Sequence, residues 1–149
     1  MTTDIEYSLD QLQFTRLLLP RLIPEHLILQ VKGRTFTAEQ FYIYIEDCIE
    51  SENPYSLIYA IVNPEKAIVG YFWIEINALD GTMFLSTYSI DKKYWNQGEA
   101  FKRAIEFLKT IIPRLGVTEV IWMTTNPRFY EKLGFKRSKN VAMCHHEIK

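Results

Sequence analysis

The pattern of apolar and polar positions along the chain predicts two helices in its first third. The first is predicted over residues 13–23, with three leucines forming its buried side: Leu17, Leu18 and Leu22. The second is predicted over residues 37–51, where apolar side chains recur at helical spacing. Thr37 is expected to be its N-cap, and Gln40, three residues later, completes a capping box.

The pattern of apolar residues then changes to one typical of strands. Three stretches rich in β-branched and aromatic residues follow one another: residues 55–62, 67–79 and 83–90. A turn is expected at residues 63–66, and the Asp80–Gly81 pair favours a tight hairpin. Because the connections are short, the three strands are predicted to form an antiparallel meander.

A third helix is predicted from residue 99 onward, with an apolar face at helical spacing: Phe101, Ala104, Ile105, Leu108, Ile111 and Ile112. Pro113 and Gly116 are expected to end it. The composition of residues 117–125 predicts a buried strand. The Asn126–Pro127 pair is typical of a helix start, N-cap followed by first helical residue.

The short helix after Pro127 is expected to stop at Gly134, and residues 135–148 to form one or two closing strands. The order of elements is therefore helices, three meander strands, helix, strand, short helix and strand. This order predicts an α+β fold with one mixed, mostly antiparallel sheet flanked by helices.

Composition narrows the class of protein. The 149 residues are 48% hydrophobic and 14% aromatic, which predicts a single domain spanning residues 1–149 with a packed core. A net charge of -1 argues against nucleic acid as a partner. The N-terminus does not resemble a signal peptide and no apolar run has the length of a membrane span, so a cytoplasmic protein without a membrane partner is expected.

The residues that could bind metal or form disulfides do not suggest such a site. Cys48 and Cys144 are far apart in the sequence and are expected to be reduced thiols. His145 and His146 are adjacent, so on a strand they would point to opposite sides. No metal is therefore predicted.

Gly98 lies where the third helix begins, with lysines and an arginine nearby. A helix start presents unpaired backbone N–H groups and the positive end of the helix dipole, and a glycine there lets an anion come close. A pyrophosphate would fit such a place. The alternative is a glycine that only eases a turn.

The stretch YSIDKKYWNQGEAFKRAIEFL, residues 88–108, resembles motif A of the GCN5-related N-acetyltransferase (GNAT) superfamily. Ile90 ends the strand, Gly98 matches the first glycine, and Ala100 matches the second small position. The segment YWNQGEA is most similar to the branch that acetylates the N-termini of ribosomal proteins. NPRFYEKLGF, residues 126–135, resembles motif B of the same superfamily.

The resemblance implies direct transfer of acetyl from acetyl-coenzyme A to an amine. The strand would pair with the pantetheine arm near Tyr88 and Ile90. Asn126 would either contact the cofactor or serve only as a helix N-cap. The pyrophosphate would be bound by the backbone N–H groups of four consecutive residues: Gln97, Gly98, Glu99 and Ala100.

Tyr130 matches the general acid of the superfamily, which protonates the leaving thiolate; its alternative role is aromatic packing. The motif A strand, with Phe84, Ser86 and Tyr88 assumed to share a face, offers no carboxylate there. Glu75 on the neighbouring strand is therefore the candidate general base. Deprotonation at pH 7 costs roughly 4.6 kcal/mol for a lysine amine of pKa about 10.4, but only about 1 kcal/mol for an α-amine of pKa about 7.8. A site without a strong base suits the α-amine or another weakly basic amine.

Two functions follow from the sequence. The first is an N-acetyltransferase acting on a small amine or a peptide N-terminus. The second is a GNAT-fold binding module without catalysis. A homodimer is one arrangement that the resemblance allows. The acidic residues of the second helix either attract a cationic substrate or form a solvated face: Glu46, Asp47, Glu50 and Glu52.

Overall fold

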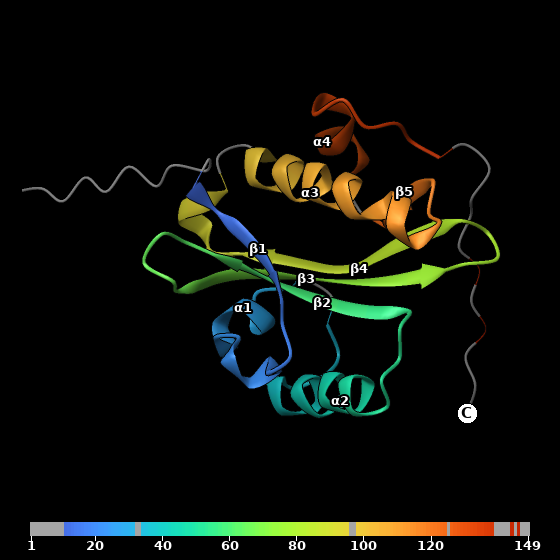
Figure 1. Cartoon of the computed structure of the whole chain (residues 1–149). Coiled ribbons are helices and arrows are strands. Elements are labelled where there is room, and N and C mark those ends of the chain that lie inside the picture. The colour runs from blue at the N-terminus through green and yellow to red at the C-terminus, as the bar shows by residue number, and fades with distance from the viewer. Residues whose placement is uncertain are drawn as a thin grey trace, which may run out of the picture.

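The computed structural model describes residues 11–31, 34–95, 98–124 and 126–138 together with Cys144 and His146, and residues 112–115 by their backbone alone. A five-stranded sheet in the order β1-β2-β3-β4-β5 runs through its centre. Helices α3 and α4 cover one face of the sheet, and α1 and α2 cover the other (Figure 1). The elements are, in chain order, β1 (Gln13–Arg16), the 3-10 helix η2 (Pro20–Leu22), α1 (Glu25–Leu29), α2 (Ala38–Glu50), β2 (Ser56–Val62), β3 (Ile68–Asn77), β4 (Thr82–Ile90), the 3-10 helix η3 (Lys92–Tyr94), α3 (Glu99–Leu115), β5 (Glu119–Ile121) and α4 (Pro127–Lys132).

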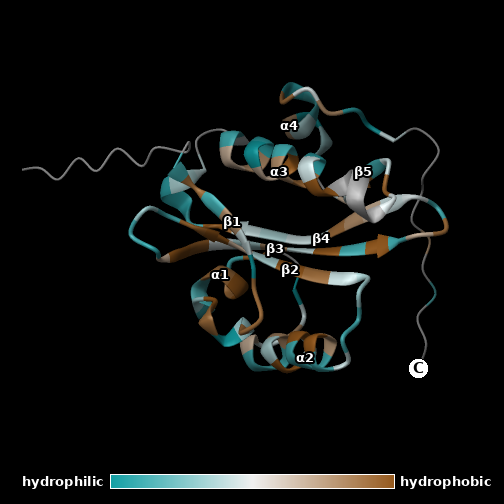
Figure 2. Cartoon of the chain, viewed as in Figure 1, coloured by the Kyte–Doolittle hydropathy of each residue, from teal (hydrophilic) through white to brown (hydrophobic). Residues whose placement is uncertain are grey.

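The sheet is mixed and mostly antiparallel, as predicted. β1 to β4 pair antiparallel in chain order, and β5 pairs parallel to β4. Successive side chains of a strand point to opposite faces, so each strand contributes to two hydrophobic cores. In Figure 2 the hydrophobic positions of α3 lie toward the sheet and its hydrophilic positions face outward. The core under α3 includes Phe72, Phe101 and Leu108, and the core under α1 and α2 includes Phe41 and Tyr71.

The prediction of a helix over residues 13–23 was wrong. The segment begins as strand β1, which pairs with β2, and continues into η2. Phe14 anchors the strand by stacking on Phe107 at 5.1 Å. Leu17 is buried, but Leu18 and Leu22 are 61% and 58% exposed. Pairing with the edge of β2 therefore outweighs the helical spacing of the leucines.

The other early predictions were confirmed. Helix α2 begins after Thr37, whose side chain accepts from the N–H of Gln40, while the Gln40 side chain accepts from the N–H of Thr37. The three meander strands form as β2, β3 and β4. The Asp80–Gly81 turn is supported by a positive φ of 67° at Gly81.

Two predictions near the C-terminus need correction. Helix α3 ends before Gly116, whose φ is 69°, as predicted, but it continues past Pro113 to Leu115. Only three residues of the predicted buried strand form β5, and Ile121 within it is 38% exposed. A proline in the last turn removes only one helical hydrogen bond, which explains why the helix passes through it.

The predicted closing strands receive no support from the described residues. Residues 135–138 are not in a strand, and residues 139–143, 145 and 147–149 lie outside the part of the chain that the structure describes. Cys48 and Cys144 are both free thiols. None of the described helices is long and apolar enough to cross a bilayer.

Candidate active site

Strand β4 has one edge that is only partly covered. Along one side it pairs with β3 from Thr82 to Ile90. Along the other side β5 pairs only with Thr82, Met83 and Phe84. Within the described residues, the backbone of β4 beyond Phe84 therefore has no strand partner on this side, and its peptide groups are available to an extended ligand.

A β-bulge lies at the point where this open edge begins. Trp73 of β3 faces Thr87, while the next residue, Ile74, faces Leu85, so Ser86 is an extra residue in β4. The bulge changes which side chains share a face. Ser86 points to the α2 side of the sheet, and Tyr88 packs on Phe101 of α3, at 5.1 Å between ring centroids. The expectation that Ser86 and Tyr88 share a face was wrong, because regular alternation does not allow for an extra residue.

The end of β4 is held by side chains that the sequence did not single out. The carbonyl oxygen of Ile90 accepts hydrogen bonds from Gln30 Nε2 at 2.7 Å and from Trp95 Nε1 at 3.0 Å. Gln30 also donates to Ser89 Oγ, and Ser89 Oγ donates to the carbonyl of Leu27. The carbonyl of Ile90 is thus already in use, which leaves Tyr88 as the better backbone position for a ligand.

Gly98 is explained by its own conformation and by α4. Its φ is 90°, a region that residues with a side chain rarely adopt. A Cβ at this position would lie 2.7 Å from Leu133 Cδ1 and 3.0 Å from Phe129 Cζ. The N–H of Gly98 donates to the carbonyl of Trp95 at 2.8 Å. The missing side chain therefore makes room for α4, and the N–H predicted to bind a phosphate already has a partner.

The other predicted phosphate-binding residues begin α3. Gln97 lies outside the described residues. Glu99 is exposed and Ala100 is buried, and both lie in the first turn of the helix, where backbone N–H groups lack helical partners. Lys102 Nζ lies 4.0 Å from Glu99 Oε1, and Lys92 Nζ lies 5.8 Å from the centre of the Trp95 ring. The surroundings of this helix start are therefore basic as well as acidic.

Tyr130 belongs to an aromatic cluster between α3 and α4. Its ring lies 5.1 Å from that of Phe101 and 5.5 Å from that of Trp122. Burial raises the pKa of Tyr130 above its ordinary value, so the hydroxyl stays protonated at neutral pH. Tyr88 contacts the same Phe101 ring, and its buried hydroxyl has no hydrogen-bond partner among the described residues. Burial, and secondarily Tyr130, raises the pKa of Tyr88.

Glu75 lies on the other face of the sheet. Its carboxylate accepts a 2.7 Å hydrogen bond from Ser86 Oγ at the bulge. Trp73, two residues earlier on the same face, packs on Tyr44 of α2 at 5.4 Å. The structure thus places Tyr130 on the α3 side and Glu75 on the α2 side, and does not bring the two predicted catalytic groups onto one face.

Asn126 occupies the N-cap position of α4, as predicted, but its side chain makes no capping hydrogen bond. Its backbone N–H donates to Thr124 Oγ1 at 3.0 Å, and the residue is exposed. The helix start therefore does not use the amide group of Asn126. Its predicted contact with the cofactor stays a prediction.

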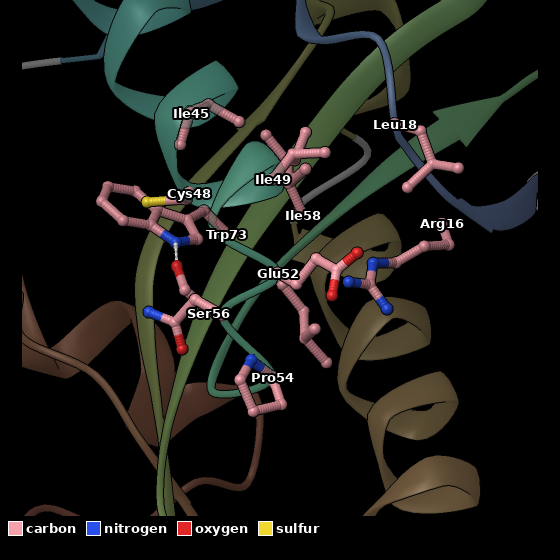
Figure 3. A pocket seen from close by; sticks show the side chains of 12 residues that line it. Arg16, Leu18, Ile45, Cys48, Ile49, Glu52, Pro54, Ser56, Ile58 and Trp73 are labelled. Atoms are coloured by element: carbon pink, nitrogen blue, oxygen red, sulfur yellow. Dashed lines mark hydrogen bonds between the residues drawn. The ribbon is translucent and has the colours of Figure 1, made fainter.

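A cavity of about 430 Å³ lies between α2 and the sheet. In Figure 3 the indole N–H of Trp73 donates to Ser56 Oγ, and the side chains of Glu52 and Arg16 point toward each other. Glu46, an acid of α2, is bound by Arg21, which also pairs with Glu39. These acids thus differ, because Glu46 of α2 is paired with Arg21, whereas Glu52, just after α2, lines the cavity together with Arg16.

Comparison with known proteins identifies the family. Residues 24–135 match the model of the acetyltransferase (GNAT) family, which is well over half of the chain. The chain belongs to this family, and as an enzyme it is classed with the acyl-CoA N-acyltransferases of the GNAT type. No curated protein matches it. The similarity to the ribosomal-protein branch stays a prediction.

Solved structures of the same fold include a glucosamine-6-phosphate N-acetyltransferase from Arabidopsis thaliana, with a TM-score of 0.63 and 22% identity over 91% of this chain and 97% of that one. An aminoglycoside acetyltransferase, meta-AAC0020, from an uncultured soil metagenomic sample, in complex with trehalose, has a TM-score of 0.68 and 15% identity over 94% and 98%. AAC(6')-Iy in complex with the bisubstrate analogue CoA-S-monomethyl-acetylneamine has a TM-score of 0.69 and 12% identity over 92% and 99%. At these identities the likeness establishes the fold.

Proposed function

We propose that the protein transfers acetyl from acetyl-coenzyme A directly to a primary amine, carried by a small molecule or a peptide N-terminus. The observation that carries the proposal is the open edge of β4, which begins at the Ser86 bulge and leads toward the start of α3. We also propose a cytoplasmic location, where the thiols of Cys48 and Cys144 stay reduced.

The described residues are suited to the cofactor at two places. The backbone of Tyr88 at the open edge is suited to pair with the pantetheine arm, since the carbonyl of Ile90 is already occupied. The first turn of α3, at Glu99 and Ala100, is suited to the pyrophosphate because helix N-termini favour anions.

When bound, acetyl-coenzyme A supplies the acetyl thioester. Glu75 would accept the proton that the acceptor ammonium loses, directly or through a water. The amine nitrogen would then bond to the acetyl carbon as the carbon–sulfur bond breaks. The second proton that the nitrogen loses would replace, directly or through solvent, the one that Tyr130 gives up. Tyr130 would give its proton to the departing thiolate, and the raised pKa keeps this hydroxyl protonated until that moment. Because Glu75 and Tyr130 lie on opposite faces of the sheet, this order of steps requires that the acceptor reach the acetyl group from the α2 side.

Thiol release in the presence of acetyl-coenzyme A and a panel of amines tests the proposal. We expect release that depends on the amine, with an increase of 42 Da in the mass of the amine, roughly the mass of an acetyl group replacing a hydrogen. A panel of small amines and peptides separates the two kinds of acceptor. Binding of acetyl-coenzyme A without release for any amine would instead favour the GNAT-fold binding module.

A further inference from the structure

A second hollow, of about 590 Å³, lies at the end of the β3–β4 hairpin and contains Glu75. Its volume is within the range of small-molecule sites. Two aromatic residues, Tyr55 and Phe84, contribute to its wall. None of the residues that line it is a lysine, arginine or histidine: Tyr55, Glu75, Ile76, Asn77, Ala78, Leu79, Thr82 and Phe84.

The negative charge of Glu75 is fixed in place and has no ion-pair partner among the described residues. Ser86 Oγ holds one carboxylate oxygen at 2.7 Å. The pKa of Tyr44 on α2 is raised by Cys48, by burial and, after these, by the negative charge of Glu75. A carboxylate held by a neutral donor keeps its full charge for a ligand.

The polar groups of the hairpin are already committed to its turn. Asn77 Nδ2 donates to Asp80 Oδ2 at 2.9 Å, and Asn77 Oδ1 accepts from the N–H groups of Leu79 and Asp80. This arrangement leaves the amide of Asn77 occupied by the turn. A phosphate or carboxylate would therefore meet the negative charge of Glu75 and no cation among the lining residues, whereas an ammonium would meet a carboxylate and aromatic side chains.

We propose that this hollow selects the acceptor by charge: the acceptor is a cationic amine whose ammonium binds at Glu75, and an anionic group close to that amine is rejected. This inference rests on the proposed acetyltransferase function and narrows its substrate class. The register of β3 and β4 supports this position for the ammonium. Glu75 pairs with Phe84 and contacts Ser86, where the open edge of β4 begins. An ammonium at Glu75 is thus next to the edge assigned to the cofactor.

Matched acceptor pairs test the charge preference. Glucosamine and glucosamine 6-phosphate carry the same amine and differ in one phosphate. The amidated tripeptides Ala-Lys-Ala and Ala-Glu-Ala share an N-terminus and differ in the charge beside it. Affinity measured by ligand-observed NMR, and kcat/KM measured by thiol release, are each expected to favour the more cationic member by roughly tenfold at low salt.

The Glu75→Gln variant is expected to remove most of this preference, because it keeps the shape of the side chain and removes its charge. Glu52→Gln is the matched control, since Glu52 lines the other cavity on the same face, and should retain the preference. Equal or reversed preference in the wild type, or a preference unchanged by Glu75→Gln, would overturn the inference even if acetyl transfer occurs. Charge-selective binding that depends on Glu75 without any transfer would support the cation site and reject the proposed function instead.

Discussion

At the residue scale, Tyr130 and Tyr88 both pack on the Phe101 ring but differ in burial. Tyr130 is half-buried and sits at the outer part of the cluster, on α4. Tyr88 belongs to β4, and its hydroxyl is buried without a partner among the described residues. A protonated hydroxyl that can reach a ligand is suited to proton transfer, and a buried unpaired hydroxyl is a cost to the free protein.

Replacement of Tyr130 by phenylalanine removes one oxygen and keeps the ring that packs on Phe101 and Trp122. We expect kcat to fall by about 10²–10⁴-fold with little change in the affinity for coenzyme A, because the proton donor acts in the transition state. Steady-state kinetics and a binding titration measure both quantities. A variant with wild-type kcat on a responsive amine would reduce Tyr130 to a packing role.

The pH dependence of kcat gives an independent check on Tyr130. The group must be protonated to donate, and burial raises its pKa above the ordinary value of 10.0. Loss of activity through its ionisation is therefore expected only above pH 10, with no decline from this cause between pH 7 and 10. A decline centred below pH 9 in the wild type that disappears in Tyr130→Phe would contradict the raised pKa.

Tyr88→Phe should stabilise the free protein. It removes a buried hydroxyl that lacks a partner among the described residues, and the cost of such a group is about 1–3 kcal/mol. Tyr42→Phe is the control, and it is expected to change the free energy of unfolding in the opposite direction. The Tyr42 hydroxyl donates to the carbonyl of Ile23 at 2.7 Å, and loss of this hydrogen bond should destabilise the protein by about 1 kcal/mol. Urea unfolding of both variants measures the two changes, and a Tyr88→Phe protein less stable than wild type would show that this hydroxyl has a partner.

At the scale of elements, Gly98 connects the start of α3 to α4. The backbone there has a φ of 90°, and the space beside its Cα is filled by Leu133 and Phe129. The interpretation of Gly98 as a glycine that lets a phosphate come close to the helix start therefore needs revision. This glycine first permits the turn and the close approach of α4, and the position of Tyr130 on α4 depends on that approach.

Gly98→Ala is expected to lower the free energy of unfolding by more than Gly134→Ala does. Both positions have similar φ values, 90° and 99°, so both substitutions carry a backbone cost of roughly 1–3 kcal/mol. Only at Gly98 would the new Cβ meet α4, since nothing lies within 4 Å of a Cβ at Gly134. Chemical denaturation of the two variants isolates the packing contribution, and equal losses would mean that α4 does not press on Gly98.

At the scale of the whole molecule, two helical layers enclose a sheet whose fourth strand, among the described residues, is open along part of one edge. A ligand that pairs with this edge and contacts α3 binds the folded state alone. Such a ligand stabilises the fold in proportion to its concentration, as mass action requires.

Acetyl-coenzyme A should therefore raise the melting temperature. At a hundredfold excess over its dissociation constant, the expected stabilisation is about 2.7 kcal/mol. Differential scanning fluorimetry measures the shift, and ATP at the same concentration is the control for a general anion effect. A melting curve that millimolar acetyl-coenzyme A leaves unmoved would count strongly against a cofactor site at β4.

The sequence by itself determined the elements whose signals are local. The capping box at Thr37, the three meander strands and the apolar face of α3 each follow from neighbouring residues, and each is present in the structure. The two family motifs also lie within short stretches. Local propensity and spacing are sufficient for such features because the interactions that stabilise them form between residues close in the chain.

Tertiary structure decided everything that depends on partners far apart in the chain. Residues 13–16 became a strand because the edge of β2 was available to them. Pairing with β3 created the bulge at Ser86 and determined that Tyr88 and Ser86 face opposite layers. Gln30 reaches Ile90 across sixty positions, and α4 gives Gly98 its packing role. Long-range contacts of this kind leave no periodic pattern in the sequence, because each is fixed only when the layers pack.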